Sequence, residues 1–254
     1  MRNDYNPYAQ QQQQPEQPRD HFPSLWGDDK DLTTATSACL VRVFMRMFAA
    51  LLVTAGVSFG VFQIPDLQMI LLGNSILFFG IIIAQFGLVM FISARLMKTS
   101  PAVSNLLFFL YAILTGVTLS VVFIAYLPGV IFQAFVVTAL TFTGMAIYGA
   151  ITKRDLTGIG SIAIMGLIGI IVASIVNIFF QNDMMTNMIN YIGVLIFVAL
   201  TAFHTQRIKN MLAEAHANNQ EEAIAQISVY GALALYLSFI NLFLRILSIL
   251  GRRR

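Results

Sequence analysis

From residue 38 onward the chain consists of long apolar runs separated by short polar segments. A helix needs about 20 apolar residues to cross the hydrocarbon core of a bilayer, and seven runs have about that length. The breaks between them carry turn residues, among them Pro65-Asp66 and Pro128-Gly129. The ten-residue alternation typical of barrel strands does not occur, so the pattern predicts an all-α membrane protein with seven transmembrane helices. The predicted spans are residues 44–62, 70–94, 103–125, 130–151, 159–180, 187–206 and 228–250.

Residues 1–37 show a different pattern, with a glutamine run at 10–14, four prolines and an acidic cluster. Such a segment buries too little apolar surface to offset the entropy lost on ordering. We therefore predict a disordered cytoplasmic tail at 1–37, followed by a membrane domain at 38–254. The tail has no apolar core after its basic residues, so we do not expect a cleaved signal peptide. The polar, alanine-rich stretch at 214–226 is predicted to be a short helical loop between the last two spans.

The composition supports the membrane assignment. Hydrophobic residues make up 57% of the 254 residues and charged residues 11%, and the mean hydropathy is +0.76. A soluble domain has about 25% charged residues, so a water-soluble enzyme is excluded. The net charge of +3 is spread along the chain, and membrane topology explains it better than nucleic-acid binding. Cys39 is the single cysteine, which excludes a disulfide framework and a cysteine-based metal site.

The basic residues fall in alternate connections between the predicted spans. Lysine and arginine follow the second, fourth and sixth spans, and neither follows the first, third or fifth. Positive charge marks the cytoplasmic side, so we predict a cytoplasmic N-terminus. Seven spans then place the arginines at 252–254 on the outer side, against the same rule, unless the last helix is re-entrant. The basic residues of these connections are Arg95, Lys98, Lys153, Arg154, Arg207 and Lys209.

The chemistry needed by known membrane enzymes is missing from the predicted spans. None of the 12 acidic residues lies inside a span, whereas an intramembrane aspartyl protease needs two buried carboxylates. A zinc protease needs a set of histidine and carboxylate ligands. A serine protease of the rhomboid type needs a serine nucleophile and a histidine, but His204 is the only histidine in a span and has no nucleophile motif near it. A retinal-binding protein needs a lysine in the last span, which has none. We therefore expect no catalytic residue, no metal site, no cofactor and no enzyme activity.

A few polar residues inside the spans invite a functional or a structural interpretation. His204 is either a titrating group that biases helix packing near neutral pH or an interfacial histidine about one turn from the end of its span. Arg245 lies about two turns from the end of the last span, and we expect its charge to reach the interface. Asn177 and Asn241 are expected to hydrogen-bond between helices. The small-residue pairs that would allow close helix approach are Gly56 with Gly60 and Gly116 with Ser120.

Four segments together resemble the Bax inhibitor-1 family, also called the transmembrane BAX inhibitor motif family. They are SPA at 100–102 with YAILTGVTLS at 111–120, YGAITKRDL at 148–156, TAFHTQRIKNM at 201–211, and GALALYLSFINLFL at 231–244. The resemblance covers residues 38–254 and is closest to bacterial inner-membrane members. It implies a bundle whose seventh helix is central and wrapped by the other six. It also implies a pH-sensitive leak of calcium or other cations, and contact with membrane-bound proteases in bacterial members.

The resemblance attributes the leak to two hydrogen-bonded aspartates that share a proton, and this chain departs from the family at both positions. Where the family motif reads Tyr-Asp-Thr, this chain has Phe203, His204 and Thr205. Where the motif reads Leu-Asp-Phe, Ser238 replaces the aspartate. A histidine and a serine contain one titrating group and no like-charge pair. Calcium prefers oxygen ligands, often carboxylates, and histidine supplies none.

Two functional hypotheses from different classes follow. The first is a pH-sensitive cation (calcium) leak channel gated around His204 and Ser238, with Arg95 as a partner. The second is a regulator of membrane stress or proteolysis that lies in the bilayer, contacts a membrane-bound protease or other membrane proteins, and lacks the leak site. The replacement of both aspartates favours the second hypothesis, in a multi-pass protein of the inner membrane.

Overall fold

The structure is a computed structural model that describes residues 30–95 and 99–251, with side chains from Thr34 onward except those of Leu72 and Arg95. These residues form helices, and no strand occurs among them, so the predicted all-α class is confirmed. Seven of the helices are long and apolar enough to cross a membrane. The helices are α1 (Lys30–Phe62), α2 (Pro65–Gly73), α3 (Ser75–Arg95), α4 (Pro101–Ala125), α5 (Pro128–Ile151), α6 (Thr157–Phe180), α7 (Asp183–Ala217) and α8 (Glu221–Leu250).

The first helix begins earlier than the sequence predicted. Residues 30–37 were assigned to the tail, but α1 starts at Lys30, and only residues 1–29 of that tail lie outside the described residues. Thr36 is 2% exposed and shares a helix face with the buried Leu40 and Val43. The packed face of α1 thus extends beyond its apolar run as far as Thr36.

The second predicted span, 70–94, is divided between two helices. Its first residues belong to α2, and α3 starts only at Ser75. Asn74 between them has extended backbone angles (φ −116°, ψ 90°), and its Oδ1 accepts a hydrogen bond of 3.1 Å from Leu77 N. Asn74 therefore caps the start of α3, a feature that a hydropathy average over this region conceals.

The stretch at 214–226 was predicted to be a short helical loop. In the structure it is the continuation of two spans. α7 continues to Ala217 and α8 begins at Glu221. The turn between them uses a left-handed residue, Asn219, with φ 53°. Leu212 and Ile227 on the two extensions are almost fully buried, so packing carries both helices past the apolar runs.

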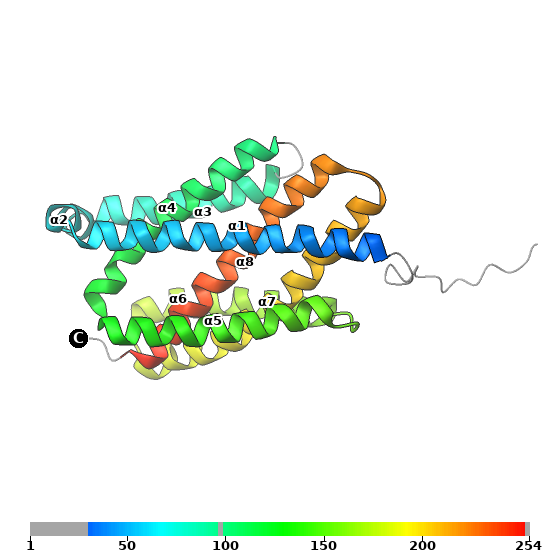
Figure 1. Ribbon diagram of the computed structural model, residues 1–254. Coiled ribbons are helices and arrows are strands. Elements are labelled where there is room, and N and C mark those ends of the chain that lie inside the picture. Colours follow the sequence, from blue (N-terminus) through cyan, green and yellow to red (C-terminus); the bar gives the residue numbers. More distant parts are fainter. Residues whose placement is uncertain (1–29, 96–98, 252–254) are drawn as a thin grey trace, which may run out of the picture.

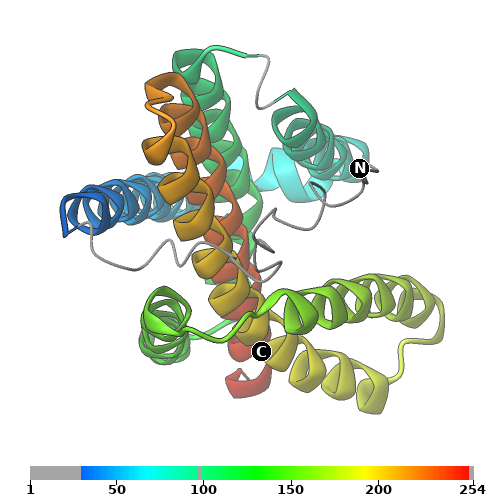
Figure 2. The ribbon, with the colours of Figure 1, turned by 90° about the vertical axis from the view of Figure 1, so that its right-hand side faces the viewer.

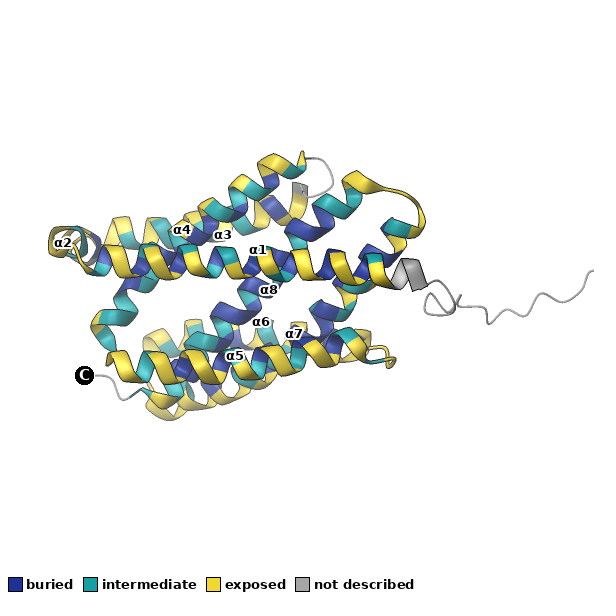
Figure 3. Cartoon of the chain, viewed as in Figure 1, coloured by how far each residue is buried: buried dark blue, intermediate teal, exposed yellow. Residues whose placement is uncertain are grey.

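The C-terminal helix α8 lies at the centre of the bundle, as the resemblance implies. Figure 2 shows α7 and α8 at the centre, with α1, α3 and α4 in the upper part of the view and α5 and α6 in the lower part. The main contacts of α8 are with α1, α4, α5 and α7, while α3 packs on α4 and α6 packs on α7. The implied wrapping by six helices is therefore wrong, because α3 and α6 form an outer layer whose side chains are mostly exposed (Figure 3).

α8 is a single unbroken helix of 30 residues, about 45 Å long at 1.5 Å per residue. That length exceeds the hydrocarbon thickness of about 30 Å, so α8 is long enough to cross the bilayer. The re-entrant alternative stays a prediction. The α5–α6 connection and the end of α7 lie at the end of the bundle where α1 begins (Figure 1). The cytoplasmic assignment of that end stays a prediction.

Only one of the two predicted small-residue pairs brings helices together. A Cβ on Gly116 of α4 would lie 2.8 Å from Thr54 O of α1, so this glycine permits the close α1–α4 approach. A Cβ on Gly56 or Gly60 would have no atom within 4 Å. The prediction for that pair is wrong, because these two glycines lie on the exposed face of α1.

Candidate functional site

The two positions where the family motif has aspartates lie on the central pair of helices, His204 on α7 and Ser238 on α8. The register of this antiparallel pair follows from three contacts, Ile208 with Gly231, Gly193 with Arg245, and Asn190 with Ser248. In this register Ser238 lies level with residues 200–201 of α7, and His204 lies level with residues 234–235 of α8. The two residues are therefore offset by about one turn, or ~5 Å along the helix axis.

No hydrogen bond between His204 and Ser238 occurs within the described residues. Ser238 is 2% exposed, and its hydroxyl donates to Ala234 O of its own helix at 3.0 Å. The His204 ring lies beside the Phe203 ring, with their centroids 5.4 Å apart. The side chain of Arg95, the third member of the predicted gate, lies outside the described residues, and its helix α3 packs on α2 and α4.

The centre of the bundle offers little to a calcium ion. Among the residues whose burial is described, none of the buried polar or charged side chains is an aspartate or glutamate. The described ranges hold no group of three or more His, Cys, Asp and Glu side chains close enough to bind a metal. Since calcium takes six to eight oxygen ligands, the carboxylates that would strengthen such a site are missing here.

Two polar side chains at the centre, Thr54 and Tyr236, are instead bonded to each other. Tyr236 of α8 is fully buried, and its OH lies 2.6 Å from Thr54 Oγ1 of α1. Thr54 Oγ1 also donates to Ala112 O of α4 at 2.9 Å. The Tyr236 ring packs edge-on against Tyr111 and Phe108 of α4. This cluster fixes α8 to α1 and α4, and the sequence analysis did not single it out, although Tyr236 lies within a matched motif.

Tyr236→Phe is expected to lower the stability of the folded chain only slightly, by about 0.6 kcal/mol. The substitution removes the bond to Thr54, but Thr54 keeps its bond to Ala112 O and is not left unsatisfied. Thermal unfolding of the detergent-solubilised chain measures the change. Tyr191→Phe is the control, because Tyr191 is 59% exposed. A loss above about 2 kcal/mol would show that the hydroxyl has a larger role than this bond.

Two of the matched motifs meet at the connection between α5 and α6. Gln206 of α7 donates to Arg154 O at 2.7 Å and accepts from Leu156 N at 2.9 Å, so one side chain binds the connection at two points. Asp155 accepts from Thr157 Oγ1 at 2.6 Å and from Thr157 N at 2.9 Å. These bonds lower the pKa of Asp155. Their stabilisation is present above the ordinary pKa of the carboxyl and is lost as pH falls through the lower folded-state value.

Gln206→Ala is expected to release this connection and to lower stability by about 1 kcal/mol. The connection contains Lys153 and Arg154, so trypsin should cut it faster in the variant than in the native chain. Gln133→Ala is the matched control, because Gln133 is exposed on α5. Equal rates of cleavage at 153–154 in the variant and the native chain would contradict the role given to Gln206.

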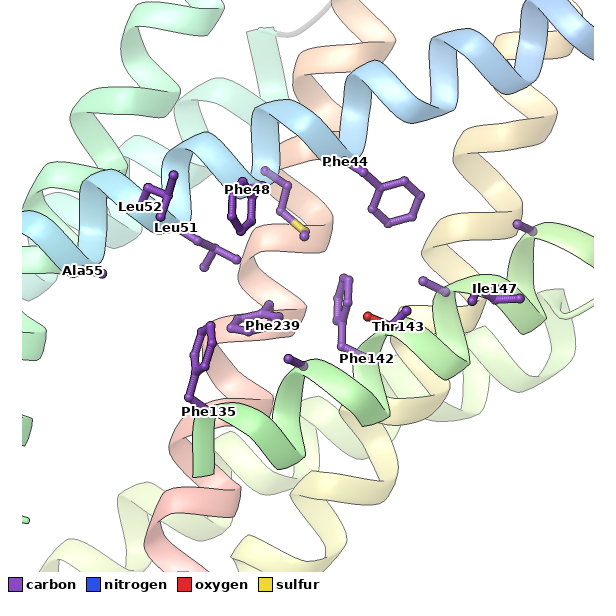
Figure 4. Close-up of a pocket in the computed structure, with 14 residues that line it drawn as sticks. Phe44, Phe48, Leu51, Leu52, Ala55, Phe135, Phe142, Thr143, Ile147 and Phe239 are labelled. Atoms are coloured by element: carbon purple, nitrogen blue, oxygen red, sulfur yellow. The ribbon is translucent and has the colours of Figure 1, made fainter. Parts of the chain in front are cut away.

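An apolar hollow of about 450 Å³ lies between α1 and α5, with α8 behind it. Figure 4 shows Phe44 and Phe48 of α1 on one side and Phe135 and Phe142 of α5 on the other, with Phe239 of α8 between them. Thr143 is the single polar residue of its lining. A second apolar hollow of about 400 Å³ adjoins it and shares Phe135 and Phe239. Such surfaces suit hydrocarbon, and their linings hold hydroxyl groups but no charged side chain.

The two asparagines predicted to bond between helices differ in the structure. Asn177 Nδ2 on α6 donates to Thr186 Oγ1 on α7 at 2.7 Å, which is an interhelical bond. Asn241 Nδ2 donates to Leu237 O of its own helix at 2.8 Å. The structure thus gives Asn241 a bond within its own helix and not the interhelical bond that was predicted.

The fold and these sites define a multi-spanning, all-α integral membrane protein. A family model described as "Inhibitor of apoptosis-promoting Bax1" matches residues 36–254. The chain therefore belongs to this family, the Bax inhibitor-1 family, which confirms the resemblance.

Bacterial relatives agree with this assignment. Inner membrane protein YbhL of Escherichia coli K12 is 43% identical over 215 residues, which are 85% of this chain and 92% of YbhL. A protein of Borreliella burgdorferi is also 43% identical over 215 residues, with the same two shares. A protein of Deinococcus radiodurans is 37% identical over 210 residues, 83% of this chain and 88% of the relative.

Proposed function

We propose that this chain is a multi-pass inner-membrane regulator that acts by contacting other membrane proteins, a membrane-bound protease among them, and that it does not conduct calcium. The inner-membrane location is supported by inner membrane protein YbhL, with which the chain shares 43% identity. One observation carries the proposal. Ser238, which replaces a family aspartate, is buried and bonds to its own helix, and no carboxylate accompanies it among the buried residues described.

The alternative function, a cation leak gated around His204 and Ser238, has less support. The two side chains are not hydrogen-bonded within the described part of the chain, and the register offsets them by about one turn. A gate that works by sharing a proton needs two groups in direct contact or joined by one water. Ser238 already donates its single proton to Ala234 O.

The regulatory role is tested by reconstituting the chain with a membrane-bound protease from the same organism. The rate at which the protease degrades a membrane substrate is measured in liposomes with the chain and in liposomes with an unrelated seven-helix protein. A change in rate that occurs only with this chain, together with a cross-link between the chain and the protease, supports the proposal. An unchanged rate without a cross-link contradicts the protease as partner.

A further inference from the structure

A polar cavity of about 650 Å³ lies between α6, α7 and α8, at the end of the bundle opposite the α5–α6 connection. Its lining includes Arg245 of α8, Asn190 and Thr186 of α7, and Asn177 and Ser174 of α6. It differs from the two apolar hollows in being lined mainly by polar groups. The cavity has no part in the function proposed above.

The guanidinium of Arg245 is held in place by two contacts with α7. Arg245 Nη1 donates to Asn190 Oδ1 at 3.2 Å, and Asn190 Nδ2 donates to Ser248 Oγ at 2.7 Å. Asn190 is itself only 3% exposed. A Cβ on Gly193 would lie 3.2 Å from Arg245 Cγ, Cδ and Nε, so this glycine provides the space in which the arginine lies. The sequence predicted that this side chain extends to the interface. In the structure its position is instead set by Asn190 and Gly193.

The charge of Arg245 is only partly compensated by the protein. A guanidinium has five N–H donors, and one hydrogen bond is described for it. No ion pair of Arg245 with an acidic side chain occurs within the described ranges, although Asp183 also lines the cavity. The hydroxyl of Ser174, on the facing helix α6, is buried without a partner. A half-buried cation with free donors, in a cavity that an unsatisfied hydroxyl also lines, is a site that an oxyanion would complete.

We propose that this cavity binds a phosphate oxyanion, with Arg245 as its main ligand. The guanidinium fork matches the geometry of phosphate oxygens, and arginine is the side chain favoured where phosphate is recognised by paired hydrogen bonds. Ile178 lines the cavity and is 69% exposed, and the adjacent Phe179 is 80% exposed, so the rim lies on a lipid-facing surface. Asp183 adds one negative charge, so the cavity favours the singly charged phosphodiester of an anionic phospholipid over inorganic phosphate.

The test compares two ligands that differ only in the head group, dioctanoylphosphatidylglycerol and dioctanoylglycerol, titrated into the purified full chain in a neutral detergent. We expect the phospholipid to bind about tenfold more tightly. Arg245→Gln should remove this difference, Arg245→Lys should keep part of it, and Arg42→Gln should leave it unchanged, since Arg42 is exposed on α1. Asp183→Asn should strengthen the binding of inorganic phosphate.

Inorganic phosphate serves as the competitor that distinguishes the two sources of the oxyanion. Displacement of the phospholipid only at much higher phosphate concentration supports a lipid head group, and displacement at equal concentration assigns the site to free phosphate. Equal affinity of the native chain for the two dioctanoyl ligands, without phosphate binding, would overturn the proposal. So would an unchanged preference in Arg245→Gln that still unfolds at the native temperature.

Discussion

Gly149→Ala is expected to lower the stability of the folded chain by about 3 kcal/mol. A Cβ at position 149 of α5 would overlap Ala202 O and lie 2.9 Å from Ala202 C and Cα, all backbone atoms of α7. Backbone atoms cannot rotate away as a side chain does, so the two helices must separate. Alanine is a better helix former than glycine by about 1 kcal/mol, and the clash must exceed that gain.

Gly144→Ala on the same helix is the matched control. A Cβ there would meet no atom within 4 Å, so this variant should be as stable as the native chain or slightly more stable. Thermal unfolding of the three proteins in one detergent gives the comparison. Unfolding of both variants at the same temperature would contradict the close contact between α5 and α7 at position 149.

Ser238→Asp is expected to lower stability at pH 8 by about 3 kcal/mol. Ser238 is 2% exposed. Of the other two residues of the predicted gate, His204 lies on α7, which packs against α8, and Arg95 lies on α3, which packs on α2 and α4. A carboxylate placed here loses its hydration and gains no lysine or arginine among the buried residues described. The loss should be smaller at pH 5, because protonation removes the charge that burial disfavours.

Ser100→Asp controls for the introduced charge itself. Ser100 is exposed at the N-cap of α4, a position where an acidic residue is favourable. This variant should unfold at or above the native temperature at pH 5 and pH 8. A native-like stability of Ser238→Asp at pH 8 would show that position 238 is hydrated, and the interpretation of a dry centre would fail.

The sequence predicted the spans well because a long apolar run has few alternatives to a membrane helix. Its errors arose where packing or capping decides the outcome. Thr36 continues the buried face of α1 outside the apolar run, and Asn74 divides one run by capping α3. The sequence alone could not distinguish the lipid-facing Gly56 from the interfacial Gly116, because spacing does not show which face meets a neighbour.

The candidate sites were less predictable than the fold. The substitutions at 204 and 238 were visible from the motifs, but their offset depends on the register of α7 and α8. The positioning of Arg245 depends on Gly193 and Asn190, which lie more than 50 residues away in the chain. One signal was available: Arg245 is an arginine in a span, and no span holds an acidic residue, so a neutral group or a ligand was a candidate partner within the spans.

The proposed loss of calcium conduction is tested most directly by calcium flux into liposomes that contain the purified native chain, measured with an internal dye from pH 6 to pH 8. A calcium ionophore added at the end shows that the dye responds. We predict a flux equal to that of empty liposomes at every pH, because the described centre of the bundle contains no buried carboxylate. A leak that varies with pH in the native chain and loses that dependence in His204→Ala would contradict the proposal and establish the gate at His204.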